Sequence, residues 1–338
     1  MTKLPRLLAE WKRQDAVLMS WPTKNMDWSA YLSEIHATYE EIILTLLRFV
    51  DVVLVTPPDS ELKETFLSEA RSSRFTFYRA GGIELNDTWI RDYGPLCVSD
   101  GRGKKEVVDF TFNGWGGKFA ADKDNAFTKQ FYDAGYFREN VLYRDARDFV
   151  FEGGAIDVSC EREGLTTRSV LTYPNRNKGD LKSQKERIQA ELGLEVLNIL
   201  SPPPLEGDDT DGHVDTMTRF VGDLDLVTCV DIDPEEVTAR YADIYIHKLP
   251  VPDPVIWEGE KKPATYANFL FTNGAIIVPT YGDPIHDKEA LKILREMTTT
   301  RRVVGVDCRT LVRQNGSLHC ATMQIPKDFL DKTKLEKA

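Results

Sequence analysis

The sequence predicts an α/β fold. Short apolar runs of strand length alternate with stretches whose apolar residues recur at helical spacing. The two kinds of segment follow one another in units of a few tens of residues, which is typical of α/β architecture. The 338 residues, 41% hydrophobic and 29% charged, suffice to bury a full core. Because no linker or low-complexity tract interrupts the pattern, we expect one continuous domain over residues 1–338.

The first elements are the clearest. Asp15 to Trp21 is an apolar run closed by Pro22, and it predicts a strand followed by a loop. From Ser29 to Phe49 apolar residues recur at helical spacing, with Ser29 as the expected N-cap. A strand over 52–56, a helix over 60–72 and a strand over 74–78 complete this part.

The same alternation continues downstream. We expect strands at 107–112, 169–172, 195–200, 224–230, 275–279 and 302–307, and helices at 125–132, 180–192 and 285–299. Strands and helices again follow one another, which supports the α/β prediction.

Charge and composition exclude several classes of protein. A net charge of −11 would repel nucleic acid and suits a cationic small molecule, although solubility alone also explains it. The most apolar run, 42–47, is far shorter than the roughly 20 residues that cross a bilayer, and the N-terminus lacks a signal-peptide core. Five widely spaced cysteines indicate neither a disulfide framework nor a zinc ribbon. We therefore expect a cytoplasmic protein without a membrane segment.

A candidate nucleophile lies near the end of the chain. Gly316 begins a short apolar-rich segment that carries His319 and Cys320 side by side. An unpaired thiol of this kind can act as a nucleophile. A free cysteine is more often a small buried hydrophobe, so this segment alone leaves both interpretations open.

A candidate acid–base pair lies at His213 and Asp215. If the chain is extended from Gly212 onward, a period of two puts both side chains on one face, where both can reach one substrate. A histidine so placed can shuttle protons near neutral pH. An acidic surface loop with an incidental histidine is about equally consistent with this stretch.

Two other stretches combine charge with aromatic or glycine residues. Residues 86–95 hold Asp87, Trp89, Arg91 and Asp92 before a Gly-Pro breaker, a mixture that is poor core material. They form either a surface ion pair or a pocket that stacks and pairs a planar cation. Glu152, before two glycines, is either a pocket carboxylate or part of a strand end and turn.

Neither a nucleotide site nor a metal site is indicated. Residues 113–118 are glycine-rich but lack the spacing of a phosphate-binding loop. Of the five histidines, only His213 and His319 lie near other candidate ligands, and no ligand spacing recurs.

Taken together, the motifs resemble the agmatine deiminase family of the guanidine-modifying (pentein) superfamily, which also includes bacterial peptidylarginine deiminases. The matching motifs, in chain order, are Trp21-Pro22, Asn86-Asp87-x-Trp89-x-Arg91-Asp92-x-Gly94-Pro95, Asn113-Gly-Trp115-Gly-Gly117, Glu152-Gly-Gly154, Asn175-Arg-Asn177, Asp211-Gly-His213-Val-Asp215, Tyr266-Ala-Asn268-Phe269 with Asn273-Gly274, and Gly316-x-x-His319-Cys320.

The resemblance implies a fold and a set of roles. The fold would be a five-bladed β/α propeller with pseudo-fivefold symmetry and a central site, and a homodimer is the family expectation. Cys320 would be the nucleophile and His213 the general acid/base. Asp92 and Asp215 would grip the guanidinium. The implied substrate-binding residues are Trp89, Glu152, Asp209, Trp115 and Asn268. No metal or organic cofactor would be required.

The implied reaction is hydrolysis of a guanidine to a ureido product and ammonia through a covalent thiouronium on Cys320. Free arginine carries a carboxylate that would need a cationic partner, and residues 113–117 contain no arginine. We therefore predict that agmatine is converted to N-carbamoylputrescine, a step of polyamine (putrescine) biosynthesis. Because Arg91, Arg144 or Arg147 could reach the site, deimination of free arginine or peptidyl-arginine stays open. A non-catalytic polyamine-binding protein would not need the thiol.

Overall fold

One strand arrangement recurs throughout the computed structural model, which describes residues 5–58, 60–160, 162–238 and 243–338. Within those residues, a unit of three strands occurs five times, its first strand antiparallel to the second and its second parallel to the third. The units are β19 (Thr322–Pro326), β2 (Gln14–Ser20) and β3 (Val52–Thr56); β5 (Leu96–Ser99), β6 (Lys105–Thr111) and β7 (Val141–Val150); β8 (Asp157–Val158), β9 (Glu163–Thr167) and β10 (Val196–Leu200); β11 (Thr218–Phe220), β12 (Asp225–Thr228) and β13 (Tyr245–Lys248); and β16 (Leu270–Phe271), β17 (Ala275–Thr280) and β18 (Arg302–Asp307).

The remaining strands extend or flank these units. β1 (Arg6–Leu7) pairs with β5, whereas β4 (Phe77–Gly81) and β20 (Glu336–Lys337) continue the first sheet beyond β3. β14 (Val255–Trp257) and β15 (Glu260–Lys262) form a separate hairpin.

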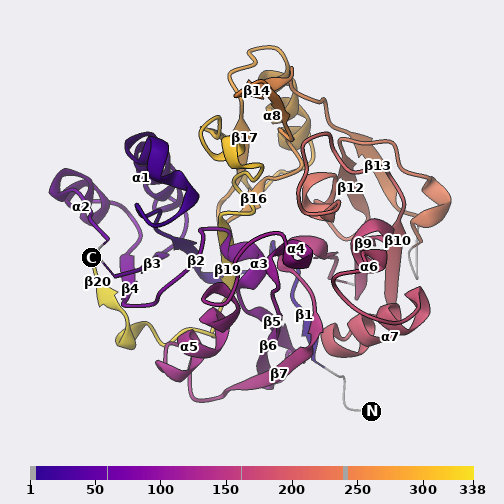
Figure 1. Ribbon diagram of the computed structural model, residues 1–338, viewed down its shortest axis with the longest axis horizontal. Coiled ribbons are helices and arrows are strands. Elements are labelled where there is room, and N and C mark those ends of the chain that lie inside the picture. The colour runs from indigo at the N-terminus through magenta and orange to yellow at the C-terminus, as the bar shows by residue number, and fades with distance from the viewer. Residues whose placement is uncertain (1–4, 59, 161, 239–242) are drawn as a thin grey trace.

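The longer helices lie at the periphery of the molecule, and the sheets surround a centre that contains α3, α4 and the start of β19 (Figure 1). The helices are α1 (Leu32–Leu46), α2 (Glu64–Arg71), α3 (Ile90–Tyr93), α4 (Gly114–Gly117), α5 (Phe127–Asp133), α6 (Arg168–Thr172), α7 (Leu181–Leu192) and α8 (His286–Glu296). Short 3₁₀ turns are η1 (Asp27–Tyr31), η2 (Asp124–Ala126), η3 (Gly153–Ala155), η4 (Val214–Thr216), η5 (Pro234–Glu236), η6 (Leu311–Gln314) and η7 (Lys332–Lys334).

The two ends of the chain meet in one sheet, because β19 pairs antiparallel with β2 and places Thr322 opposite Met19. Every residue of β2 and β3 is buried, which explains their continuous apolar runs. This pairing brings the segment just before β19 to the centre of the molecule, where the predicted nucleophile lies.

The α/β prediction is confirmed, and two local predictions are wrong. Residues 169–172 belong to the helix α6 and not to a strand, because the Thr167 side chain accepts the Val170 N–H and caps a helical turn. Ser29 does not cap the first long helix. It lies inside η1, and α1 begins only at Leu32.

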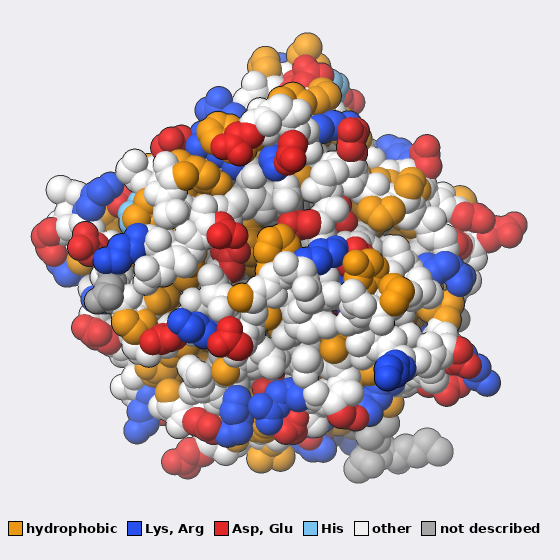
Figure 2. All heavy atoms as spheres, in the orientation of Figure 1, with side chains coloured by type: hydrophobic (Ala, Val, Ile, Leu, Met, Phe, Trp, Pro, Cys, Tyr) orange, Lys and Arg blue, Asp and Glu red, His pale blue; other side chains and the backbone are white. Residues whose placement is uncertain are grey.

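Charged side chains of both signs are interspersed over the face shown in Figure 2. Among the described residues, no helix combines the length and the apolar character needed to cross a bilayer.

Candidate functional site

A cavity of about 350 Å³ opens beside Cys320. Its wall combines acidic, aromatic and a few basic side chains drawn from segments far apart in the chain. Of the residues predicted for the site, the wall includes Trp89, Asp92, Trp115, Asp209 and Cys320. His213, Asp215, Glu152 and Asn268 lie directly behind these wall residues, as their contacts show.

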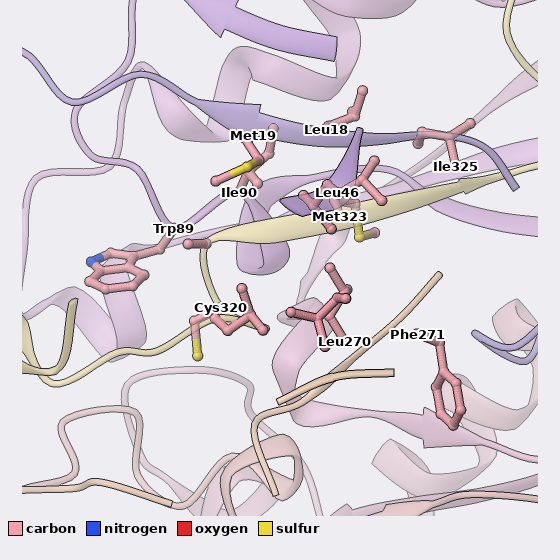
Figure 3. Close-up of a cluster of buried hydrophobic side chains, with 14 of the residues drawn as sticks. Leu18, Met19, Leu46, Trp89, Ile90, Leu270, Phe271, Cys320, Met323 and Ile325 are labelled. Atoms are coloured by element: carbon pink, nitrogen blue, oxygen red, sulfur yellow. The ribbon is translucent and has the colours of Figure 1, made fainter. Parts of the chain in front are cut away.

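Cys320 lies between η6 and β19, with its sulfur directed away from the strands that carry Leu18 and Met323 (Figure 3). The Asn268 amide donates to its Sγ at 3.3 Å, and a carboxylate oxygen of Asp215 lies 3.8 Å from the same atom. Trp89 lines the same cavity as Cys320, and its ring leaves no space for a side chain at position 316, where a Cβ would lie 2.3 Å from the ring. The thiol is thus held against a carboxylate at the inner end of the cavity.

Asp92 is the second carboxylate at this end. Its Oδ2 accepts the indole N–H of Trp115 at 2.9 Å, and its Oδ1 accepts the backbone N–H of Gly154 at 2.9 Å. Trp115 has a left-handed backbone with φ 54°, a rare conformation for a bulky residue. The glycine-rich loop therefore turns the indole toward Asp92, which is a structural role for the motif.

His213 and Asp215 come together, but the predicted extended geometry is wrong. His213 precedes η4 and Asp215 lies within it. The turn is held by the Asp208 carboxylate, which accepts the backbone N–H groups of Thr210 and Gly212. His213 Nδ1 lies 3.6 Å from Asp92 Oδ1, and both ring nitrogens lack a hydrogen-bond partner within the described residues. An unpartnered buried imidazole is free to exchange protons with a substrate.

Two predicted substrate-binding residues, Glu152 and Asn268, are not among the described residues that line the cavity. Glu152 is fully buried and forms an ion pair with Arg176 at 2.8 Å, while its other oxygen lies 4.0 Å from His213 Nε2. Asn268 also accepts the backbone N–H of His319 at 2.9 Å. Glu152 therefore lies behind His213, and Asn268 supports the segment that carries the thiol.

His319 connects the site to the N-terminal segment. Its Nδ1 lies 2.7 Å from Asp215 Oδ2 and its Nε2 lies 2.8 Å from Glu10 Oε1. Glu10 also pairs with Arg91 at 3.0 Å and with Arg219 at 2.6 Å. Sequence reasoning missed Glu10, because 309 residues separate it from His319 and no local pattern marks the contact.

Burial sets the protonation of the inner groups. It raises the pKa of the Cys320 thiol well above its ordinary value, and the Asp215 and Asp92 carboxylates raise it further. Burial also lowers the pKa of His213 to about 3, although the negative charge of Asp215 would raise it. At neutral pH these shifts leave a neutral thiol beside a neutral imidazole.

The two carboxylates differ sharply. Burial, and next the Asp215 charge, raise the pKa of Asp92 well above its ordinary value. Burial would also raise that of Asp215, but the hydrogen bond and charge of His319 hold its pKa below the ordinary value. Two neighbouring acids with opposite shifts are typical of catalytic sites.

Apart from Asp87, which belongs to the predicted stretch 86–95, the far end of the cavity contains residues that sequence reasoning missed. Its acidic side chains are Asp27, Asp87 and Glu258, its aromatic ones Tyr31 and Trp257, and its basic ones Lys262 and Arg313. The Arg313 guanidinium lies over the Trp257 ring, 4.0 Å from its centroid, and pairs with Glu34 at 2.7 Å. Glycine-bounded motifs marked the inner end of the cavity, whereas most of these side chains come from η1, η6 and the β14–β15 hairpin, which no motif marks.

A family described as the Porphyromonas-type peptidyl-arginine deiminases matches residues 6–326. Agmatine deiminase of Stutzerimonas stutzeri is 31% identical over an alignment covering 98% of this chain and 99% of that protein. A structure of a Cys-to-Ser variant of C. jejuni agmatine deiminase with substrate bound is 31% identical, with a TM-score of 0.84 and coverage of 96% and 97%. Dimethylarginine dimethylaminohydrolase from Pseudomonas aeruginosa shares the fold, with a TM-score of 0.53, 15% identity and coverage of 93% and 100%.

Proposed function

The chain belongs to the Porphyromonas-type peptidyl-arginine deiminase family, and from that premise we propose that it hydrolyses agmatine to N-carbamoylputrescine and ammonia. One observation carries the proposal. A cysteine thiol lies beside two carboxylates and a neutral imidazole at the inner end of a cavity whose far end is acidic and aromatic. That arrangement fits a planar cation that must be held and attacked at carbon.

Asp92 and Asp215 hold the guanidinium. A guanidinium presents donors in a planar fork, which two facing carboxylates can accept together. Oδ1 of Asp215 is buried and has no hydrogen-bond partner within the described residues. A donor from the substrate would satisfy that oxygen, and its positive charge would favour ionisation of Asp92 and of the thiol.

The first half of the reaction forms a covalent bond. The Cys320 thiol proton passes to His213, and the sulfur adds to the guanidinium carbon to give a neutral tetrahedral adduct. The His213 imidazolium then returns the proton to the departing nitrogen, so that the C–N bond breaks and ammonia leaves. A positively charged thiouronium remains on Cys320.

The second half releases the product. Neutral His213 takes a proton from water as the oxygen adds to the thiouronium carbon. The C–S bond then breaks, the sulfur recovers a proton as the thiol, and the ureido product leaves. The remaining proton passes from the site to solvent, where the ammonia released in the first half takes it up as ammonium, so the charge of the substrate is conserved.

The charges around the cavity favour an amine over a carboxylate at the far end of the substrate. Asp27 and Glu258 line the cavity without an ion-pair partner among the described residues, whereas Lys262 and Arg313 are paired with Glu260 and Glu34. Agmatine, with a cation at each end, fits such a wall.

Three arginine side chains were considered as possible partners for the carboxylate of an arginine substrate, and all three contact other groups. Arg91 is bound to Glu10 behind the site, whereas Arg144 pairs with Glu106 and Arg147 with Asp145. None of the three is among the described residues that line the cavity. Arg313 favours the second candidate function, deimination of free or peptidyl arginine, because it places a cationic side chain in the wall of the cavity.

The experiment compares agmatine with L-arginine as substrates of the purified protein, following ammonia and ureido product, with Cys320→Ala alongside. We expect turnover of agmatine that disappears in the variant and is far slower with arginine. Faster turnover of arginine would keep the chemistry and refute the substrate assignment. Binding of agmatine without turnover of either compound would replace the enzyme by a polyamine-binding protein.

We further propose that residues 1–338 form one catalytic domain built as a five-bladed β/α propeller, and that the protein is a homodimer. The five recurring three-stranded units support the propeller. Ultracentrifugation would test the dimer.

A further inference from the structure

A line of alternating charges runs from the thiol to the N-terminal segment. Asp215 contacts His319, and His319 contacts Glu10, through the 2.7 Å and 2.8 Å contacts at its two ring nitrogens. Beyond Glu10 lie the guanidinium groups of Arg91 and Arg219. All five residues are buried or nearly so, Glu10 having the largest exposed side-chain fraction at 13%.

Both ring nitrogens of His319 therefore face a carboxylate oxygen. An ionised carboxylate can only accept hydrogen bonds, so two such partners require a ring that donates from both nitrogens. A neutral ring donates from one nitrogen only and would need a protonated acid on the other side. The two arginines keep Glu10 ionised, and its pKa is held well below the ordinary value by Arg219, His319 and Arg91 despite burial, which would raise it.

The charges of the buried group balance when His319 is cationic. Arg219 Nε also pairs with Asp157 at 3.1 Å. Three carboxylates then face two guanidiniums and one imidazolium, so no charge in the group lacks an opposite neighbour. Buried ionic groups persist only when they are paired in this way.

We propose that Glu10 fixes His319 as a doubly protonated imidazolium, and that this fixed charge keeps Asp215 ionised and oriented beside Cys320. Glu10 and His319 are positioning residues that act through Asp215. The proposal deepens the deiminase function and rests on it only for its kinetic readout.

Other charged groups also act on Asp215. Arg219 favours its ionised form, His213 does so only when it is protonated, and the Cys320 sulfur lies 3.8 Å away. Asp92 opposes it as a like charge. Because His319 makes a shorter hydrogen bond to the Asp215 carboxylate, at 2.7 Å, than the Cys320 thiol does at 3.8 Å, its loss should raise the proton affinity of Asp215 most.

The direct test is nitrogen NMR of the imidazole rings, which distinguishes a protonated ring nitrogen from a bare one. The chain has five histidines, and the signals that disappear in His319→Gln identify this one. We expect both nitrogens of His319 to be protonated at about pH 7 in the wild type, and one to lose its proton in Glu10→Gln. A neutral His319 ring in the wild type would overturn the proposal.

The kinetic test uses the pH dependence of kcat/KM for agmatine. Without the imidazolium, Asp215 takes up a proton at higher pH and no longer accepts from the guanidinium, so the loss must grow as the pH falls. A hydrogen bond to a charged group predicts a loss of about 10- to 100-fold near pH 6 for Glu10→Gln and His319→Gln, and a smaller loss near pH 9.

Asp157→Asn is the matched control, because it removes a buried carboxylate from Arg219 without contacting His319. Its loss should not grow as the pH falls. Equal losses at every pH in Glu10→Gln would refute the positioning role and indicate a structural one. If Glu10→Gln does not fold, the wild-type NMR spectrum still decides. If the wild type deiminates nothing, the proposed function fails while that spectrum still reports on His319.

Discussion

Gly154 packs directly against His213 and Asp92, and substituting it with alanine should separate activity from stability. A Cβ added there would lie 2.6 Å from Nδ1 of His213 and 2.8 Å from Oδ1 of Asp92. Ordinary contact begins at 3.4 Å, so the imidazole would have to retreat by about 0.8 Å. The φ angle of Gly154 is not positive, so alanine brings no backbone strain, and the N–H that serves Asp92 is kept.

The expected loss follows from that displacement. A catalytic group displaced by about 1 Å lowers the rate by about 100-fold, so kcat/KM of Gly154→Ala should fall by about that factor. Overpacking of a buried site lowers the free energy of unfolding by about 1–3 kcal/mol, which leaves a domain of this size folded.

The assay measures agmatine turnover and urea unfolding on the same preparations. Gly222→Ala is the control, because its new Cβ would meet its nearest atom at 3.6 Å and its φ is not positive. If Gly154→Ala is folded and keeps kcat/KM within about threefold of the wild type, the predicted dependence on the His213 position is wrong.

Three further predictions concern charge. Arg176→Gln should lower the free energy of unfolding by about 3 kcal/mol, because it leaves the Glu152 carboxylate buried and unpaired; unchanged urea denaturation would contradict this. Burial raises the pKa of Asp109 to about 6, so the folded protein binds this proton more tightly than the unfolded chain does. The resulting stability, at most about 3 kcal/mol, is fully present below about pH 4 and is lost as the pH rises from about 4 through 6. Asp109→Asn should therefore gain stability over the wild type from pH 5 to pH 8 in urea titrations, and a constant difference would refute it. The thiolate absorbance of Cys320 should be absent near pH 8 and should increase when a non-reacting guanidinium compound binds; an absorbance independent of the compound would contradict substrate-assisted ionisation.

Local sequence patterns predicted the longer helices and several of the buried strands, but not β5, β7 or β9. The run Val52 to Thr56 matches β3 residue for residue, because a buried strand needs a continuous apolar stretch. The pattern failed at Ser169, where a side-chain cap converts an apolar stretch into a helical turn. It also failed between His213 and Asp215, where carboxylate-to-backbone bonds replace the extended chain.

The sequence by itself determined the α/β class, the family and the chemical types of the residues now found at the inner end of the cavity, since glycine-bounded motifs and residue order are local properties. Only the tertiary structure decided which side chains touch. The pairing of β19 with β2 brings Cys320 to the centre, and Glu10 then meets a histidine 309 residues away. The spacing of apolar residues along the chain indicates which face of a segment is buried, whereas contacts between distant segments depend on how the sheets assemble. For that reason Arg313 and the protonation of the buried carboxylates emerged only from the folded chain.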